Sequence, residues 1–233
     1  MKITLYGFRI SPFVEKVIRG VQYKGLAWEI QAPSGLTGMR KWSPRTGKMP
    51  VADIAGERLY DSTFILRRLD ELTPNPPLVS PDPVIAARQR HMEDWSDESL
   101  YWNVMAFRWS PSNGRASAER VLDAISPPAP LRPLISPIMC RTVRRQVAAQ
   151  GAGRLPEGVL AREFGGRLDD LVRLLDDRAF FFSDTPSVAD LAVFGQLTFA
   201  DVGVSPETRD EVQKRQPLVE YMKRVAQATT GAN

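Results

Sequence analysis

The spacing of apolar residues over the first 25 positions predicts a strand followed directly by a helix. Residues 3–8 carry an apolar run of period two, which is typical of a strand. Ser11 suits the N-cap of the following helix, Pro12 suits its first turn, and Gly25 suits its end. The apolar face of this helix is formed by Phe13, Val14, Val17, Ile18 and Val21.

Three further short strands and a second helix are predicted before residue 76. Apolar runs at 26–31, 49–54 and 59–60 read as strands, and residues 55–58 read as the turn between the last two. Ser62 is the expected cap of a helix with apolar residues at 65, 66, 69 and 72. This order of elements predicts a small α+β domain over residues 1–76.

The pattern changes after residues 73–83, where five prolines in eleven positions indicate a linker. No strand pattern follows, so we expect an all-helical domain over residues 84–228. Its helices are predicted near residues 83–109, 140–150, 158–177, 187–200 and 217–228. The proline-rich stretch 110–138 is expected to be irregular for part of its length, and its path is open.

Composition narrows the class of protein. The 233 residues are 43% hydrophobic and 25% charged, as in ordinary globular proteins, and the net charge of +4 lacks the clustering expected of a nucleic-acid binder. No apolar run approaches the roughly 20 residues that span a bilayer. Cys140 and His91 are the single residues of their types, so we expect no disulfide and no metal site. We expect a cytoplasmic protein.

The start of the first predicted helix is the strongest candidate for chemistry. It places the hydroxyl of Ser11 where unpaired backbone N–H groups favour an anion. Such a position suits the binding or generation of a thiolate. The alternative is that Ser11 serves as a helix cap and nothing more.

Together with the order of elements, four local motifs resemble the glutathione transferase superfamily across essentially the whole chain. The resemblance implies a thioredoxin-like N-terminal domain that binds glutathione, and a helical C-terminal domain that supplies the wall for a second substrate. The motifs are Ser11-Pro12-Phe13, Lys48-Met49-Pro50-Val51, Asp61-Ser62 and Ser187-Val188-Ala189-Asp190. The last is a helix-capping box and supports the fold without bearing on catalysis.

The first motif is similar to that of serine-type transferases, notably the plant-type tau members. The resemblance implies that the Ser11 hydroxyl donates a hydrogen bond to the glutathione sulfur. A free cysteine thiol ionises near pH ~8.5, and a hydrogen-bond donor beside a helix N-terminus favours its thiolate. Tyr6 is a rival for this role, because some transferases use an early tyrosine on the first strand.

The other two motifs imply a site for the peptide itself. By resemblance, Lys48 faces the glycine carboxylate, the backbone of Met49 pairs with the cysteinyl residue, and Pro50 is the family's cis-proline. Asp61 takes the γ-glutamyl ammonium while Ser62 takes the carboxylate. Family members most often have Glu or Gln where Asp61 stands. A surface lysine at 48 and a helix cap at 62 are the alternatives.

A narrower resemblance appears in the C-terminal half. Residues 144–146, 151–154 and 179–184 resemble bacterial transferase-like proteins related to metaxin and failed-axon-connections proteins. This allows a second hypothesis, a non-catalytic binding or scaffold protein. A glutathione-dependent reductase or isomerase is a third, although a thiol–disulfide enzyme is expected to carry a cysteine in place of Ser11.

We therefore predict a glutathione transferase that conjugates glutathione to an apolar electrophile, with a homodimer as the default assembly. The tryptophans at 95, 102 and 109 are interpreted mainly as core, with residues 92–109 forming part of the second-substrate wall. Glu93, Asp94, Asp97 and Glu98 are interpreted as an acidic face matched by arginines at 88, 90, 141, 144 or 145. The alternative is that one of these acids completes the glutathione ammonium site or pairs across a dimer.

Overall fold

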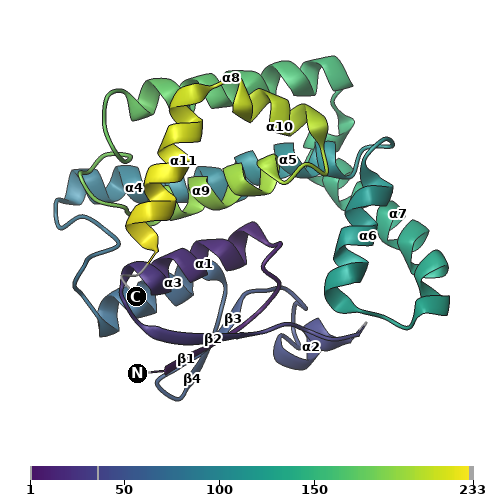
Figure 1. The fold of residues 1–233 in the computed structure, drawn as a ribbon, viewed down its shortest axis with the longest axis horizontal. Coiled ribbons are helices and arrows are strands. Elements are labelled where there is room, and N and C mark those ends of the chain that lie inside the picture. The colour runs from purple at the N-terminus through teal and green to yellow at the C-terminus, as the bar shows by residue number, and fades with distance from the viewer. Residues whose placement is uncertain (1, 36, 231–233) are drawn as a thin grey trace.

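The computed structural model describes residues 2–35 and 37–230 and opens with a four-stranded sheet of order β2-β1-β3-β4. Strands β1 and β2 are parallel, while β3 pairs antiparallel with both β1 and β4. The sheet lies below the helices in Figure 1. Its strands are β1 (Lys2–Tyr6), β2 (Ala27–Gln31), β3 (Val51–Ile54) and β4 (Glu57–Tyr60).

Side chains that alternate along β1 show which face of the sheet the helices α1 and α3 cover. Ile3 and Leu5 are fully buried against α1 (Pro12–Tyr23) and α3 (Ser62–Leu72). Since side chains alternate along a strand, Tyr6 points to the opposite face, beside the short α2 (Gly38–Trp42). The sequence pattern thus predicted both the strand and the helix that it feeds.

The rest of the chain is helical, as expected, and stacks above α1 and α3 (Figure 1). One nearly continuous helix is formed by α4 (Pro83–Trp95), a π-helical turn (Ser96–Leu100) and α5 (Tyr101–Arg108). The predicted helix over 83–109 is therefore confirmed, with a π turn inside it. The remaining helices of this stack are α8 (Glu157–Leu175), α9 (Val188–Asp201), α10 (Pro206–Gln213) and α11 (Gln216–Thr229).

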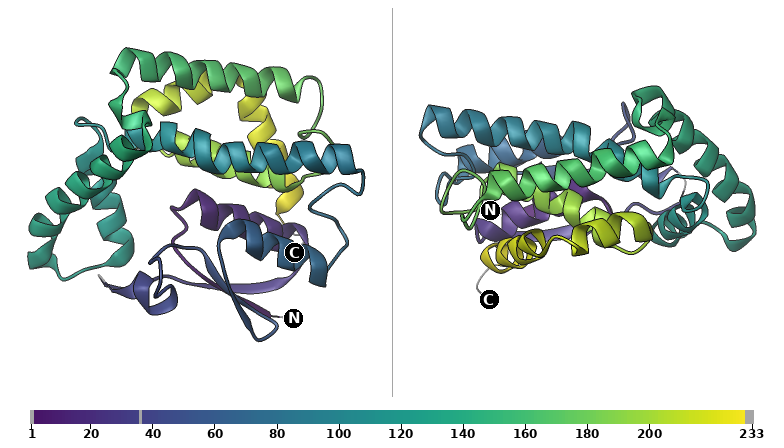
Figure 2. Two further views of the ribbon diagram at one scale, coloured as in Figure 1. Left: turned by 180° about the vertical axis from the view of Figure 1, so that it is seen from behind. Right: turned by 90° about the horizontal axis from the view of Figure 1, so that it is seen from above.

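Residues 110–113 and 126–131 lie outside the α-helices, so the stretch 110–138 is irregular for part of its length, as predicted. The prediction missed the helix over 114–125 and placed the start of the next helix near 140 instead of 132. Helix α6 (Gly114–Ile125) and helix α7 (Arg132–Gln150) form a pair that extends from the side of the body (Figure 2). Three of the prolines lie in the connection 127–130, and Pro133 lies in the first turn of α7, where proline is compatible with a helix. Proline content therefore marks a turn and a helix start here, while Pro137 lies inside α7.

Helix α9 is buried along most of its length and joins the two halves of the molecule. Val188 and Leu191 contribute to the core between the sheet and α1. The predicted capping box at its start is present: the carboxylate of Asp190 accepts from the Ser187 amide at 2.9 Å and from the Ser187 hydroxyl at 2.9 Å. The other carboxylate oxygen accepts from the Phe181 amide and the Tyr221 hydroxyl, so the buried acid is fully bonded.

Gly195 in α9 allows the closest approach of the two halves. A Cβ at this position would stand 2.6 Å from the backbone carbonyl oxygen of Pro12. We expect Gly195→Ala to lower the free energy of unfolding by about 1–3 kcal/mol, measured by denaturant titration. Gly166→Ala in α8, where a Cβ would meet nothing within 4 Å, is the matched control. It is expected to raise stability by about 0.5–1 kcal/mol, so equal effects in both variants would contradict the steric explanation.

Candidate functional site

Ser11 is half-buried at the start of α1, in extended conformation with φ −87° and ψ 128°. Its amide donates to the carbonyl of Phe8 at 2.9 Å. Its side chain makes no capping hydrogen bond, and no partner for its hydroxyl is found within residues 2–35 and 37–230. The hydroxyl thus lies at a helix N-terminus with its donor uncommitted.

The segment before β3 adjoins the turn that leads to Ser11. The peptide bond between Met49 and Pro50 is cis. A Cβ placed on Gly7 would lie 3.6 Å from the Met49 Cβ, so the two segments are neighbours. The Pro50 carbonyl accepts a hydrogen bond from the Asp61 amide at 3.4 Å, which brings the second and third sequence motifs together.

The structure corrects the cap of α3. Asp61, and not Ser62, is the N-cap, and its carboxylate accepts from the Thr63 amide at 2.9 Å. Asp61 has φ +76°, a left-handed conformation that is costly for a residue other than glycine and that is concentrated at functional sites. Ser62 is the first residue of the helix and is buried. Lys48 is exposed, with no ion pair to any described residue.

Tyr6 is committed elsewhere. Its hydroxyl donates to the Asp53 carboxylate at 2.8 Å, and its ring packs on Trp42 with centroids 4.8 Å apart. Burial and the neighbouring Asp53 carboxylate raise the pKa of Tyr6. The Arg58 guanidinium completes this group on the face of the sheet that α1 does not cover. The Tyr6 hydroxyl is therefore already hydrogen-bonded, whereas that of Ser11 is not.

A buried ammonium lies behind the site. Lys16 Nζ contacts the carboxylates of Glu93 and Asp97, each at 2.6 Å, and the Thr63 hydroxyl at 3.2 Å. Thr63 in turn donates to Glu93 at 3.0 Å. All three N–H groups of the lysine therefore have acceptors. The interpretation of Glu93 and Asp97 as an acidic face matched by arginines is wrong, because their partner is the buried Lys16.

One cation against two carboxylates leaves this buried cluster with an excess negative charge. Burial raises the pKa of Asp97 to about 6, against the opposing effect of Lys16 and with a contribution from Glu93 and Asp61. The second carboxylate oxygen of Asp97 is buried without a partner among the described residues. The region behind Asp61 therefore has unfilled capacity to accept a hydrogen bond.

Apolar residues from the helical half stand beside the turn before Ser11. Phe8 and Ile10 pack against Leu122 and Ile125 of α6, together with Met39. The ring of Phe13 meets that of Tyr101 in α5 edge-on, with centroids 4.9 Å apart.

The three tryptophans divide between core and surface. Trp109 is buried in the core of the helical half, while Trp95 and Trp102 are partly buried against that core. Trp95 also lines a hollow of about 570 Å³ between α4 and α8. A larger hollow of about 920 Å³ lies between α6 and α7, away from Ser11.

Two ranges of the chain match models of known protein families. Residues 5–77 match the family model of the glutathione S-transferase N-terminal domain, and residues 166–225 match that of the glutathione S-transferase C-terminal domain. The chain belongs to the glutathione transferase superfamily. Residues 78–165, which include α6 and α7, lie outside both matches.

Solved structures share the fold at low sequence identity. A GST-like protein from Pseudomonas syringae is 18% identical with a TM-score of 0.66, over 99% of this chain and 68% of its own. A glutathione S-transferase from Methylobacterium radiotolerans, in complex with glutathione sulfonate, is 22% identical with a TM-score of 0.63, over 100% and 97%. The β-etherase LigF from Sphingobium is 20% identical with a TM-score of 0.64, over 96% and 100%.

Sequence reasoning found the three motifs that the fold brings together and missed the residue that supports them. Lys16 stands between a glutamate and a valine in α1 and reads as an ordinary helix-surface lysine. The available signal was the pair Glu93 and Asp97, two like charges one helical turn apart, which is locally unfavourable without a partner from elsewhere in the fold.

The pKa of Asp97 predicts a pH dependence of stability. A folded-state pKa of about 6 exceeds the unfolded value of about 3.9, so the native state holds this proton more tightly. The stability of the wild type relative to Asp97→Asn should therefore fall as pH rises from 4 to 7, by on the order of 2–3 kcal/mol. Denaturant unfolding at each pH measures this difference.

Asp53 supplies a control of opposite sign for that experiment. Its hydrogen bond from Arg58 lowers its pKa, so its contribution to stability is present above the unfolded pKa and is lost as pH falls. The stability of the wild type relative to Asp53→Asn should rise with pH. A difference for Asp97→Asn that does not change with pH would contradict the raised pKa.

Proposed function

We propose that this protein conjugates reduced glutathione to an apolar electrophile, with Ser11 stabilising the thiolate. The observation that carries the proposal is the hydroxyl of Ser11, which lies at the N-terminus of α1 and is not used as a cap. A donor and a helix N-terminus together favour a sulfur anion over the thiol. The thiolate is the nucleophile that attacks the electrophile.

The remaining motif residues are proposed to hold the tripeptide. The backbone of Met49, before the cis-proline Pro50, is suited to antiparallel pairing with an extended peptide. The start of α3 offers the Ser62 hydroxyl and free N–H groups to a carboxylate. The Asp61 carboxylate is proposed to pair with the γ-glutamyl ammonium of glutathione, and the Lys48 ammonium with its glycine carboxylate. Residues 1–76 are the proposed glutathione-binding unit.

Aromatic and aliphatic side chains beside Ser11 support an apolar second substrate. Phe8, Ile10 and Phe13 surround the turn into α1, and α5 and α6 contribute Tyr101 and Leu122 next to them. A homodimer in the cytoplasm remains part of the proposal, by analogy with the superfamily.

The second candidate is a binding protein without transferase activity. It is favoured by Asp61, whose side chain is shorter than the Glu or Gln most often found at this position in the family and whose carboxylate caps α3 at Thr63. A glutathione-dependent reductase or isomerase shares the same binding residues, and a panel of substrates separates it from a transferase.

The Ser11→Ala variant tests the proposed catalytic role. Loss of a donor to a developing anion lowers kcat/KM by about 10²–10³-fold, and we expect this for glutathione conjugation to a chromogenic electrophile. Tyr6→Phe is the matched control, because it also removes one hydroxyl, but one that donates to Asp53. Its turnover should match the wild type. Equal losses in the two variants would move the role away from Ser11.

Glutathione binding is tested without turnover by thermal unfolding. Ligand at ~100 times its Kd stabilises the folded state by about 2.7 kcal/mol, so millimolar glutathione should raise the Tm of the wild type. Ser62→Ala should reduce this shift, since it removes a hydroxyl from the start of α3. Ser183→Ala, which removes a half-buried loop hydroxyl of the helical half that donates to the Thr185 carbonyl, should retain it. No shift in the wild type would favour the binding-protein candidate with another ligand.

A further inference from the structure

The α6–α7 pair carries the positive charge of the whole protein. Residues 111–155 contain seven arginines, two acidic residues and no lysine or histidine, a net charge of +5. The whole chain has a net charge of +4, so everything outside this stretch is close to neutral, at −1. The charge that looks mild across the chain is therefore concentrated on one projecting lobe (Figure 2).

Some of these arginines have partners within the protein and others do not. Arg132 pairs with Glu119 at 3.0 Å, and Arg144 donates to the backbone carbonyl of Trp109 at 2.8 Å. Arg115, Arg141 and Arg145 are exposed and form no ion pair with any residue in the described ranges. The excess charge therefore faces solvent.

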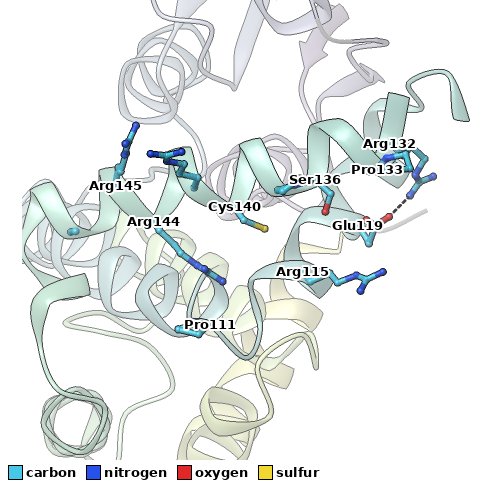
Figure 3. Close-up of a pocket in the computed structure, with 12 residues that line it drawn as sticks. Pro111, Arg115, Glu119, Arg132, Pro133, Ser136, Cys140, Arg144 and Arg145 are labelled. Atoms are coloured by element: carbon cyan, nitrogen blue, oxygen red, sulfur yellow. Dashed lines mark hydrogen bonds and ion pairs between the residues drawn. The ribbon is translucent and has the colours of Figure 1, made fainter. Parts of the chain in front are cut away.

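The exposed side of α7 combines these arginines with aliphatic residues. Leu134 and Ile138 are 63% and 65% exposed, and Leu131 just before the helix is 39% exposed. The positions 134, 138, 141 and 145 are separated by four, three and four residues, so they share one face of the helix. Figure 3 shows Arg145 pointing away from Arg144, which is directed toward Pro111 at the start of the α6 segment.

A face of this kind matches the interface of an anionic bilayer. An amphipathic helix lies at headgroup level with aliphatic side chains in the acyl boundary and arginines on the lipid phosphates. No described helix is long and apolar enough to cross a membrane, so the contact would be peripheral. We propose that the exposed face of α7 docks the protein on the surface of membranes that contain anionic lipids.

Other occupants fit this face less well. A second copy would bring one lobe of +5 against another, and like charges oppose that contact. Nucleic acid would satisfy the arginines but would leave Leu134 and Ile138 against phosphates. The sequence from 110 to 163 also contains no aromatic residue on which a base could stack.

The test is co-sedimentation of the full-length protein with lipid vesicles. We expect binding to vesicles of mixed phosphatidylcholine and phosphatidylglycerol, and none to phosphatidylcholine alone. Raising the salt from 0.1 M to 1 M shortens the Debye length from ~10 Å to ~3 Å and should weaken the binding. Failure of the wild type to bind anionic vesicles at low salt, or equal binding to both vesicles, would overturn the proposal.

Two double variants separate the charged and apolar contributions. Arg141→Gln with Arg145→Gln should lower the partition coefficient about thirtyfold, at about fivefold for each arginine near an anionic surface. Leu134→Ser with Ile138→Ser should lower it about tenfold or more, because aliphatic burial is lost. If the arginine variant loses binding and the aliphatic variant does not, the face binds lipid phosphates without inserting, and the proposed burial of Leu134 and Ile138 in the acyl boundary is wrong.

Matched controls use the same chemistry on other helices. Arg88→Gln with Arg162→Gln removes two exposed arginines from α4 and α8. Val84→Ser with Leu174→Ser removes two exposed aliphatic residues from the same helices. Both should bind vesicles like the wild type, and equal losses would show that overall charge or hydrophobicity, and not α7, is responsible.

Soluble glycerol phosphate in the assay distinguishes two sources of the phosphate. If the face binds a free phosphate ligand, glycerol phosphate should compete fully with the vesicles. If the face binds a bilayer, glycerol phosphate should not release the protein from the vesicles.

Discussion

The buried ammonium of Lys16 is the constraint on which the arrangement of this molecule depends. An ammonium without solvent contact is tolerated only where each N–H group has an acceptor. Here the acceptors come from the start of α3, from α4 and from the π turn that follows it. Two of these belong to the helical half, so the ion cluster fixes how that half sits on α1. Removal of one partner from such a cluster typically lowers stability by about 3–5 kcal/mol.

The same cluster sets the positions of the two ends of the proposed glutathione site. Ser11 begins the helix that carries Lys16, and Ser62 directly precedes Thr63, which accepts from Lys16. A shift of α1 against α3 would therefore break a buried hydrogen bond before it could alter the spacing between the two serines. Close packing of α9 on the first turn of α1, at Gly195 and Pro12, adds a steric limit on that movement.

Local patterns predicted most of the fold because they arise from local physics. Periods of two and 3.6 located β1, α1 and α3, and the Ser187–Asp190 box located the start of α9. Lys16 could not be recognised in the same way, since its two carboxylate partners lie 77 and 81 residues away and its burial is a property of the assembled halves. The N-cap of α3 was predicted at Ser62 and lies at Asp61 for a similar reason. Both residue types cap helices, and the left-handed backbone of Asp61 is not visible in the sequence.

The α6–α7 pair shows why a proline-rich stretch can still contain helices that the sequence analysis did not predict. Proline prevents a helix only where a backbone N–H is needed, and most prolines of this stretch occupy the connection or a first turn. The pair therefore keeps two regular faces. Its inner face places Leu122 and Ile125 against the turn before Ser11, while its outer face holds the aliphatic residues and arginines of α7. Both faces belong to one helix pair that lies outside the two family matches. The residues beside the turn before Ser11 and the exposed face of α7 are therefore parts of the same lobe.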